Sequence, residues 1–211
     1  MMIVIINPNS TVAMTDEMVR TGRDIYPDVE MQGWTSHDGP PAIQGPEDGK
    51  TCIPPMLKLV EKASGLGAKS IIIGCFDDTG LDEARAIANC QVIGVGQAAY
   101  YLAASIGAKF SVVTTLEVSV PVLQDNIRAY GLSQKLGRVR ASGVQVLELE
   151  QDRYAATAKV LDEARKAVSE DSVQSIVLGC AGMTSVVQAA GPAFPVRLID
   201  GVTAAINFSV F

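Results

Sequence analysis

Short apolar runs alternate with longer segments of helical period along most of the chain. A short apolar run bounded by Gly, Pro or polar residues is typical of a buried parallel strand. The pattern predicts strands at 2–6, 29–34, 70–74, 91–95, 109–114, 144–149, 175–179 and 196–199. Helices are predicted between them, at 12–25, 53–65, 80–89, 96–107, 117–131, 152–169, 184–190 and 201–207. This alternation predicts an α/β fold built on parallel sheets.

The two halves of the chain repeat the same local patterns. The run IIIGC at 71–75 recurs 105 residues later as IVLGC, and VIGVGQAA at 92–99 resembles LIDGVTAA, 106 residues further on. VIINPNS at 4–10 and SVVTTLE at 111–117 both read as a strand, a polar turn and a helix start. We infer two pseudo-symmetric halves. The first lobe is expected to comprise residues 1–95 with 196–211, and the second residues 96–195.

Composition and charge limit the classes of partner. Hydrophobic residues make up 48% and charged residues 19% of the 211, which is typical of a globular protein. The net charge is −6 without a basic cluster, which argues against nucleic acid and anionic membranes as partners. The start MMIVIINPNS lacks the basic region of a signal peptide, and no apolar stretch approaches the roughly 20 residues of a membrane helix. We therefore expect a cytoplasmic protein that acts on a small molecule.

The cysteines are expected to remain reduced thiols in that compartment. Cys52, Cys75, Cys90 and Cys180 lack the paired spacing of a zinc or redox site, and His37 is the only histidine, so no metal is expected. Cys75 and Cys180 each follow an apolar strand directly, at the edge of a parallel sheet where ligands bind. A helix N-terminus beside each thiol would lower its pKa from about 8.5 toward neutrality.

Two such thiols facing one cleft suit the inversion of a stereocentre. One thiolate removes a proton from carbon, and the opposite thiol delivers a proton to the other face. The alternative is that both are inert, buried core residues, which is the interpretation we adopt for Cys52 and Cys90. The duplicated context of Cys75 and Cys180 favours a catalytic pair. A redox sensor, in which the two thiols join under oxidant, is a further alternative.

Longer motifs resemble the aspartate/glutamate/hydantoin racemase superfamily. INPNST at 6–11, GCFDDTGLDEAR at 74–85 and LGCAGM at 178–183 carry the resemblance. The loop GPPAIQGPEDG at 39–49 and VRLIDGV at 196–202 are similar to the hydantoin and allantoin racemase branch. The resemblance implies two Rossmann-like (flavodoxin-like) halves with parallel sheets and the active site in the cleft between them. It also implies Cys75 and Cys180 as the acid/base pair, no cofactor, and a homo-oligomer.

Candidate substrate-binding residues lie in the turns around the two cysteines and in the Gly- and Pro-rich loop at 36–49. They are Asn9, Pro40, Ile43, Phe76, Thr114, Thr115, Gly182 and Met183. Each has a structural alternative: the Asn and Thr residues in helix capping, and the loop residues in a surface turn. Ser10 or Thr11 is expected to cap the first helix. Asp77 has a second interpretation, a backbone N–H donor or pocket wall like Phe76, but for Asp77 and Asp78 we favour helix capping, because a carboxylate beside the thiol would oppose its ionisation.

Arg140 has two interpretations, a group that reaches the cleft or a member of an exposed ion pair, whereas His37 is expected to be exposed.

Because the candidate turns offer neutral amides and hydroxyls, the sequence predicts a cofactor-independent racemase of a hydantoin-type ureide ring, either a 5-substituted hydantoin or allantoin. Aspartate/glutamate-type racemisation, maleate isomerisation and a non-catalytic ligand-binding module remain open alternatives. A pyridoxal-phosphate enzyme would need a Schiff-base lysine and a phosphate cradle, and neither is evident.

Overall fold

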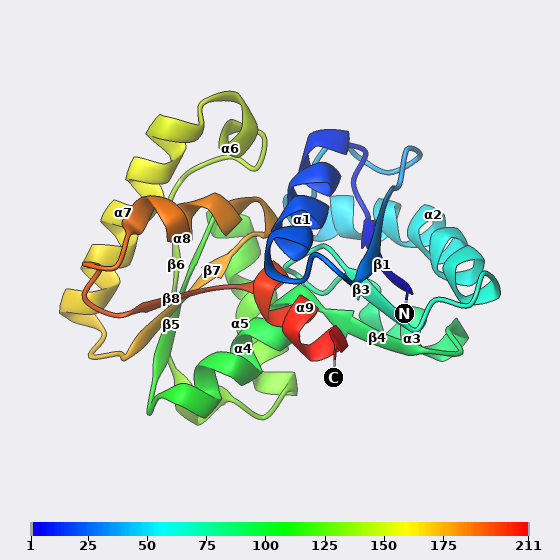
Figure 1. Cartoon of the computed structure of the whole chain (residues 1–211). Helices are drawn as coiled ribbons and strands as arrows, with labels where there is room; N and C mark the ends of the chain where they lie inside the picture. Colours follow the sequence, from blue (N-terminus) through cyan, green and yellow to red (C-terminus); the bar gives the residue numbers. More distant parts are fainter. Residues whose placement is uncertain (1, 211) are drawn as a thin grey trace.

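Two four-stranded parallel sheets form the frame of the protein. A computed structural model describes residues 2–210 (Figure 1). The first sheet has the order β2-β1-β3-β4, with β1 at Met2–Asn7, β2 at Glu30–Thr35, β3 at Ser70–Ile73 and β4 at Gln91–Gly94. The second has the order β6-β5-β7-β8, with β5 at Phe110–Thr114, β6 at Leu136–Ala141, β7 at Ser175–Gly179 and β8 at Arg197–Asp200. The identical strand order confirms the predicted pair of similar α/β halves.

Helices cover both faces of each sheet. They are α1 at Val12–Ile25, α2 at Pro46–Gly65, α3 at Leu81–Ile87, α4 at Val95–Ile106, α5 at Val120–Ala129, α6 at Glu148–Gln151, α7 at Arg153–Glu170, α8 at Thr184–Ala190 and α9 at Gly201–Val210. Helix α2 starts seven residues earlier than predicted. Pro46 occupies its first position and Glu47 and Asp48 lie in its first turn, which are favourable helix-start residues. No described helix is long and apolar enough to cross a membrane.

The predicted strand at 144–149 is wrong. The strand that pairs with β5 is β6, at Leu136–Ala141. Strand β6 is an edge strand, and it contains Arg138 and Arg140. These charged residues interrupt the apolar run by which buried strands are recognised in a sequence. The apolar residues Val144 and Val146 are buried from a loop instead, which continues into α6.

The last helix of each half packs across the boundary between the sheets. Helix α4 follows β4 but contacts β7 and β8, whereas α9 follows β8 but contacts β3, β4 and α1. The two helices also pack against each other at the centre of the molecule (Figure 1). Strand β8 itself pairs with β7, so the segment 196–199, assigned above to the first lobe, lies in the second sheet. The exact lobe boundaries stay a prediction.

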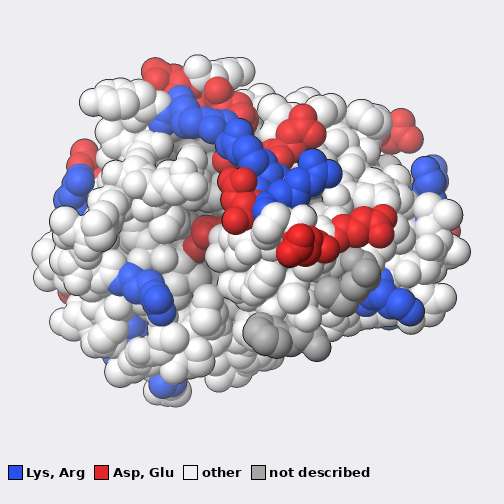
Figure 2. All heavy atoms as spheres, viewed as in Figure 1, with Lys and Arg blue, Asp and Glu red and all other residues white. Residues whose placement is uncertain are grey.

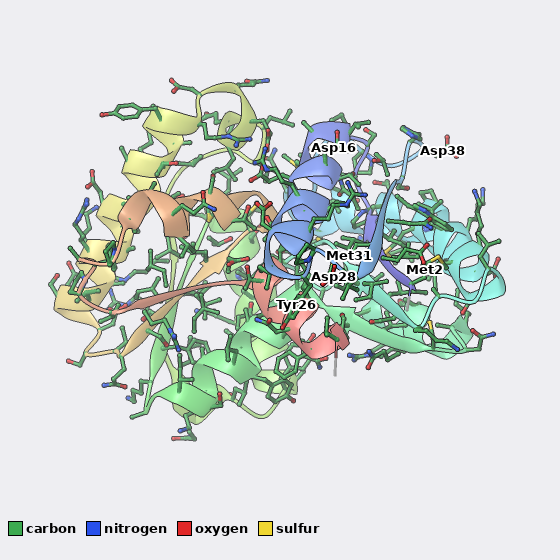
Figure 3. The ribbon with its side chains drawn as sticks, viewed as in Figure 1. Met2, Asp16, Tyr26, Asp28, Met31 and Asp38 are labelled. Atoms are coloured by element: carbon green, nitrogen blue, oxygen red, sulfur yellow. The ribbon has the colours of Figure 1, made fainter. Side chains whose placement is uncertain are left out.

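Aromatic and aliphatic side chains from both halves share one central core. Tyr100 of α4 is fully buried, with its ring centroid 5.5 Å from that of Phe76 and 6.0 Å from that of Phe110. Tyr26, labelled in Figure 3, lies beside α9, and its hydroxyl donates to the Asn207 side chain at 2.9 Å. The two halves are therefore joined by packing as well as by the chain.

Surface charges of both signs are intermixed on the face drawn in Figure 2. Among the described residues, one ion pair bridges the halves, between Arg153 at the start of α7 and Glu17 of α1, at 3.5 Å. Arg20 also pairs with Glu17. Both arginines are exposed whereas Glu17 is mostly buried, so solvent screens these pairs in part, and each contributes on the order of 1 kcal/mol.

Candidate active site

Cys75 and Cys180 lie at equivalent places in the two halves and line one cavity. Cys75 follows Gly74 at the end of β3, and Cys180 follows Gly179, the last residue of β7. The cavity between them measures about 40 Å³, which is room for only a few water molecules. The carboxyl edges of both sheets therefore converge on the two thiols, as the repeated sequence predicts.

The predicted substrate-binding residues divide into two groups. Asn9, Ile43, Phe76, Thr115 and Gly182 line the cavity together with the two cysteines. The other three predicted residues, Pro40, Thr114 and Met183, have structural contacts instead. The Pro40 carbonyl accepts a hydrogen bond from the Ser10 N–H at 2.9 Å, the Thr114 hydroxyl donates to the Gly179 carbonyl at 2.9 Å, and Met183 is buried in the core of the second half. Substrate contact by any of these residues stays a prediction.

Asn7, in the same turn as Asn9 at the edge that carries Cys75, also lines the cavity. Further lining residues that the sequence did not predict include Met14, Met18, Ser119 and Val146. Asn7 ends β1, and its side-chain amide donates to Asn9 Oδ1 at 2.9 Å and to Thr15 Oγ1 at 3.1 Å. This network holds the first turn beneath the cavity. The signal for Asn7 was its place at a strand end, in the same INPNST motif as Asn9.

The first turn is fixed by its asparagines. Asn9 Oδ1 accepts from the Thr11 N–H at 2.9 Å, and Asn7 Oδ1 accepts from the Asn9 N–H at 3.2 Å. Thr11 occupies the N-cap position of α1, as predicted, but its side chain makes no capping hydrogen bond. The Thr11 hydroxyl donates to the Pro41 carbonyl at 2.7 Å and thereby ties the loop at 36–49 to this turn.

The environment of the thiols differs from the sequence prediction. Burial, followed by the charge of Asp77, raises the pKa of Cys75 well above its ordinary value. Burial likewise raises the pKa of Cys180 to about 12, although the backbone N–H of Gly182 favours the thiolate. Desolvation outweighs the hydrogen bonds that favour each thiolate, so the expected lowering of both pKa values is wrong. Both thiols are protonated at neutral pH.

The two carboxylates after Cys75 have different roles. Asp78 accepts hydrogen bonds from the backbone N–H groups of Gly96 at 3.0 Å and Gln97 at 2.7 Å. It therefore caps a helix as predicted, but the helix is α4 rather than the one that follows it in sequence. Asp77 is not a cap: it lines the cavity beside the thiols. Burial raises the pKa of each carboxyl to about 7.

The charged candidates named from the sequence lie elsewhere. Arg140 is buried in an ion-pair cluster, with its guanidinium 3.0 Å from Glu163 and 2.6 Å from Glu170. His37 is exposed, as predicted. No Lys, Arg or His is among the described residues that line the cavity. Within residues 2–210, no three His, Cys, Asp or Glu side chains gather in a way that would hold a metal ion.

Comparison with known proteins agrees with this arrangement. Residues 3–208 match the Asp/Glu/Hydantoin racemase family. The hydantoin racemase of Rhizobium meliloti is 39% identical over 210 residues, which span 99% of this chain and 87% of that protein. The structure of an allantoin racemase from Klebsiella pneumoniae superposes with a TM-score of 0.95 at 32% identity, covering 99% of this chain and 86% of that one.

A more distant structure shares the fold alone. Glutamate racemase from Francisella tularensis in complex with D-glutamate has a TM-score of 0.69 at 18% identity, over 98% of this chain and 78% of that one.

The family match and the hydantoin racemase relative confirm, over nearly the whole chain, the resemblance read from the sequence motifs. The chain belongs to the Asp/Glu/hydantoin racemase family of isomerases.

Proposed function

We propose that the protein inverts the acidic C–H stereocentre of a hydantoin-type ureide ring, with Cys75 and Cys180 as the two acid/base groups and no cofactor. One observation carries the proposal: the two thiols stand at pseudo-equivalent strand ends and line the same cavity. Opposed acid/base groups are what inversion requires, since the proton must leave one face of the carbon and return to the other.

The chemistry balances with the two thiols alone. One cysteine, as thiolate, takes the proton from the ring carbon, and the electron pair passes onto the adjacent carbonyl as an enolate. The opposite thiol then donates its proton to the other face, so that the thiol and thiolate exchange positions. Because burial raises both thiol pKa values, one proton must leave before turnover begins. Backbone N–H groups at the strand ends, such as that of Gly182, are suitable donors to negative charge.

The polar lining supports a neutral ring as substrate. Asn9, Thr115 and Ser119 offer an amide and two hydroxyls. The related proteins named above are a hydantoin racemase and an allantoin racemase, and both names refer to ureide rings. From the loop at 36–49, Ile43 adds an apolar wall to this lining.

The alternatives left open by the sequence require different groups. Aspartate, glutamate and maleate all carry a carboxylate, which is usually held by a cation or by several N–H donors. The described lining of the cavity contains Asp77 and no cation, which favours the ureide over these anions.

The test is racemisation of single-enantiomer 5-substituted hydantoins, and separately of allantoin, in D₂O. Optical rotation follows racemisation and proton NMR follows exchange at the stereocentre, after subtraction of the nonenzymatic rate. We expect activity in the wild type and in the control Cys52→Ser, whose site lies outside the cavity, and none in Cys75→Ser or Cys180→Ser. A single-cysteine variant that exchanges deuterium without racemising would assign each thiol to one face. Racemisation that survives both substitutions would refute the two-thiol mechanism.

A further inference from the structure

Asp77 is a carboxylate held beside both thiols. It follows Cys75 by two residues and lines the cavity. Its backbone carbonyl accepts a hydrogen bond from the side-chain amide of Asn126, at 2.7 Å, so helix α5 of the second half anchors the loop. The position of this side chain is thus set by both halves of the molecule.

The carboxylate of Asp77 has no partner of its own among the described residues. Burial is the sole cause of its raised pKa, with no hydrogen bond or cation acting in the opposite direction. Its charge also acts on Cys75 and on Cys180, which places it near both. Asp78, the next residue, has three donors: the N–H groups of Gly96 and Gln97 and the Tyr130 hydroxyl. The contrast marks Asp77 as an acceptor directed at the cavity.

We propose that Asp77 determines substrate specificity by accepting a hydrogen bond from an N–H of the ureide ring and by repelling substrates that carry a carboxylate. This inference rests on the proposed function and names the group that selects its substrate class. A partly buried acceptor without a protein donor is satisfied by water or by a ligand, and a ligand N–H that displaces the water takes over its hydrogen bond. A ureide ring carries N–H groups beside its stereocentre and between its carbonyls, whereas a dicarboxylate would place like charges together in a water-poor site.

The kinetic experiment compares matched substrates in wild type, Asp77→Asn and Asp77→Ala. The first comparison is between 5-(carboxymethyl)hydantoin and 5-(carbamoylmethyl)hydantoin, which differ in charge and hardly in shape. The second is between a 5-alkylhydantoin and its N1-methyl and N3-methyl derivatives. We expect wild type to prefer the amide over the carboxylate, and the parent ring over one N-methyl derivative. Both preferences should shrink in Asp77→Ala, by roughly 10- to 100-fold for the N–H comparison, and the charge preference should also shrink in Asp77→Asn.

The matched control is Asp28→Asn. Asp28, labelled in Figure 3, is exposed and lies just before β2, at the amino edge of the first sheet, and it is not among the residues that line the cavity. The Asp28→Asn substitution removes the same charge from the protein as Asp77→Asn does. The substrate preferences of this control should therefore equal those of wild type. A uniform fall in kcat/KM for every substrate in both Asp77 variants would show a merely structural role and overturn the proposal.

A binding measurement separates this inference from the proposed function. Calorimetric titration with unsubstituted hydantoin needs no turnover and no stereocentre. Weaker binding to Asp77→Ala than to wild type, with the difference lost for one N-methylhydantoin, supports the recognition role even if no racemisation is found. Equal binding to both proteins overturns the role of Asp77 while leaving racemisation intact. Failure of wild type to bind or racemise any of these rings would overturn both proposals.

Discussion

The hydroxyl of Tyr130 donates a hydrogen bond to the carboxylate of Asp78 at 2.9 Å. Tyr130 ends helix α5 of the second half, and Asp78 lies in the loop that carries Cys75 in the first. The same carboxylate caps α4, the helix that crosses between the sheets. One buried side chain therefore couples the Cys75 loop to two helices packed on the second sheet.

Substitution of Tyr130 by Phe should destabilise the protein by about 1–3 kcal/mol. It removes a hydrogen bond to a charged acceptor that water does not reach freely. Urea unfolding at pH 7.5 measures the effect. Tyr154→Phe is the control, because Tyr154 is 89% exposed and its loss should change the free energy of unfolding by less than about 0.5 kcal/mol. Equal stability of both variants would mean that Tyr130 contributes nothing to the junction.

Gly96→Ala should be strongly destabilising and should also lower activity. A Cβ at Gly96 would fall on the Phe76 carbonyl oxygen and lie 2.8 Å from Asp78 Oδ2, so the α4 cap and the Cys75 loop would have to move. The expected cost is about 1–3 kcal/mol or more, as for other overpacked sites. Gly65→Ala, with no atom within 4 Å of its added Cβ, should be neutral or slightly stabilising. Thermal unfolding of the two variants gives the comparison.

The frame of the fold was readable because buried parallel strands are almost wholly apolar. Ile71–Ile73 and Ile176–Leu178 are fully buried, and their repeated pattern revealed the two halves. The edge strand β6 was missed because an edge tolerates Arg138 and Arg140, while Val144 and Val146 imitate a strand from a loop. The packing of α4 and α9 across the boundary between the sheets could not be predicted from the sequence, because an apolar helix face does not indicate which sheet it will cover.

The site was predicted only in part, for a similar reason. Two strand-end thiols in duplicated context identified the cavity from the sequence. Met14 and Met18 were not recognised, because an i, i+4 pair of methionines on a helix has the pattern of an ordinary core face. Asp77 and Asp78 are adjacent and chemically identical, and only the fold shows that one caps α4 while the other enters the cavity. Thiol pKa values depend on burial, which no local motif specifies.

The cavity thiols should react slowly and with a strong dependence on pH. Since burial raises the pKa of Cys180 to about 12, its thiolate fraction increases about tenfold per pH unit over pH 7–9. The rate of iodoacetamide labelling of the ligand-free protein is measured for each cysteine by mass spectrometry. For Cys75 and Cys180 this rate should keep rising with pH over that range. A labelling rate that stops rising near pH 7 for either cysteine would instead indicate the lowered pKa expected from a helix N-terminus alone.

Asp77→Asn should stabilise the protein more at pH 8 than at pH 5. The folded-state pKa of about 7 lies above the ordinary 3.8, so the folded protein binds more protons between these values. The contribution of this carboxyl to stability is thus greatest below pH 4 and falls as pH rises toward 7. Asn does not titrate, and its advantage over wild type should grow by about 2–3 kcal/mol from pH 5 to pH 8. Urea unfolding at both pH values checks this, with Asp28→Asn reporting the effect of net charge alone.

Arg140→Gln should unfold far more easily than wild type while leaving KM unchanged. The Arg140 side chain is 7% exposed, and its Nε lies 2.8 Å from the carboxylate of Asp171, which is 2% exposed. Burial alone would raise the pKa of Asp171, but hydrogen bonds from Arg140 and Ser111 outweigh it and lower that pKa. Removal of the guanidinium leaves the buried Asp171 carboxylate with only the more distant Arg138, at 3.7 Å, which should cost about 3 kcal/mol.

The control is Arg165→Gln, which breaks an exposed pair with Asp162 and should cost less than about 1 kcal/mol. Steady-state racemisation kinetics at a temperature where the Arg140 variant stays folded then separates stability from catalysis. An increased KM in Arg140→Gln, with kcat and folding intact, would mean that Arg140 acts on the substrate after all. An unchanged KM would confine it to the far end of the second half, where it holds β6 against the end of α7.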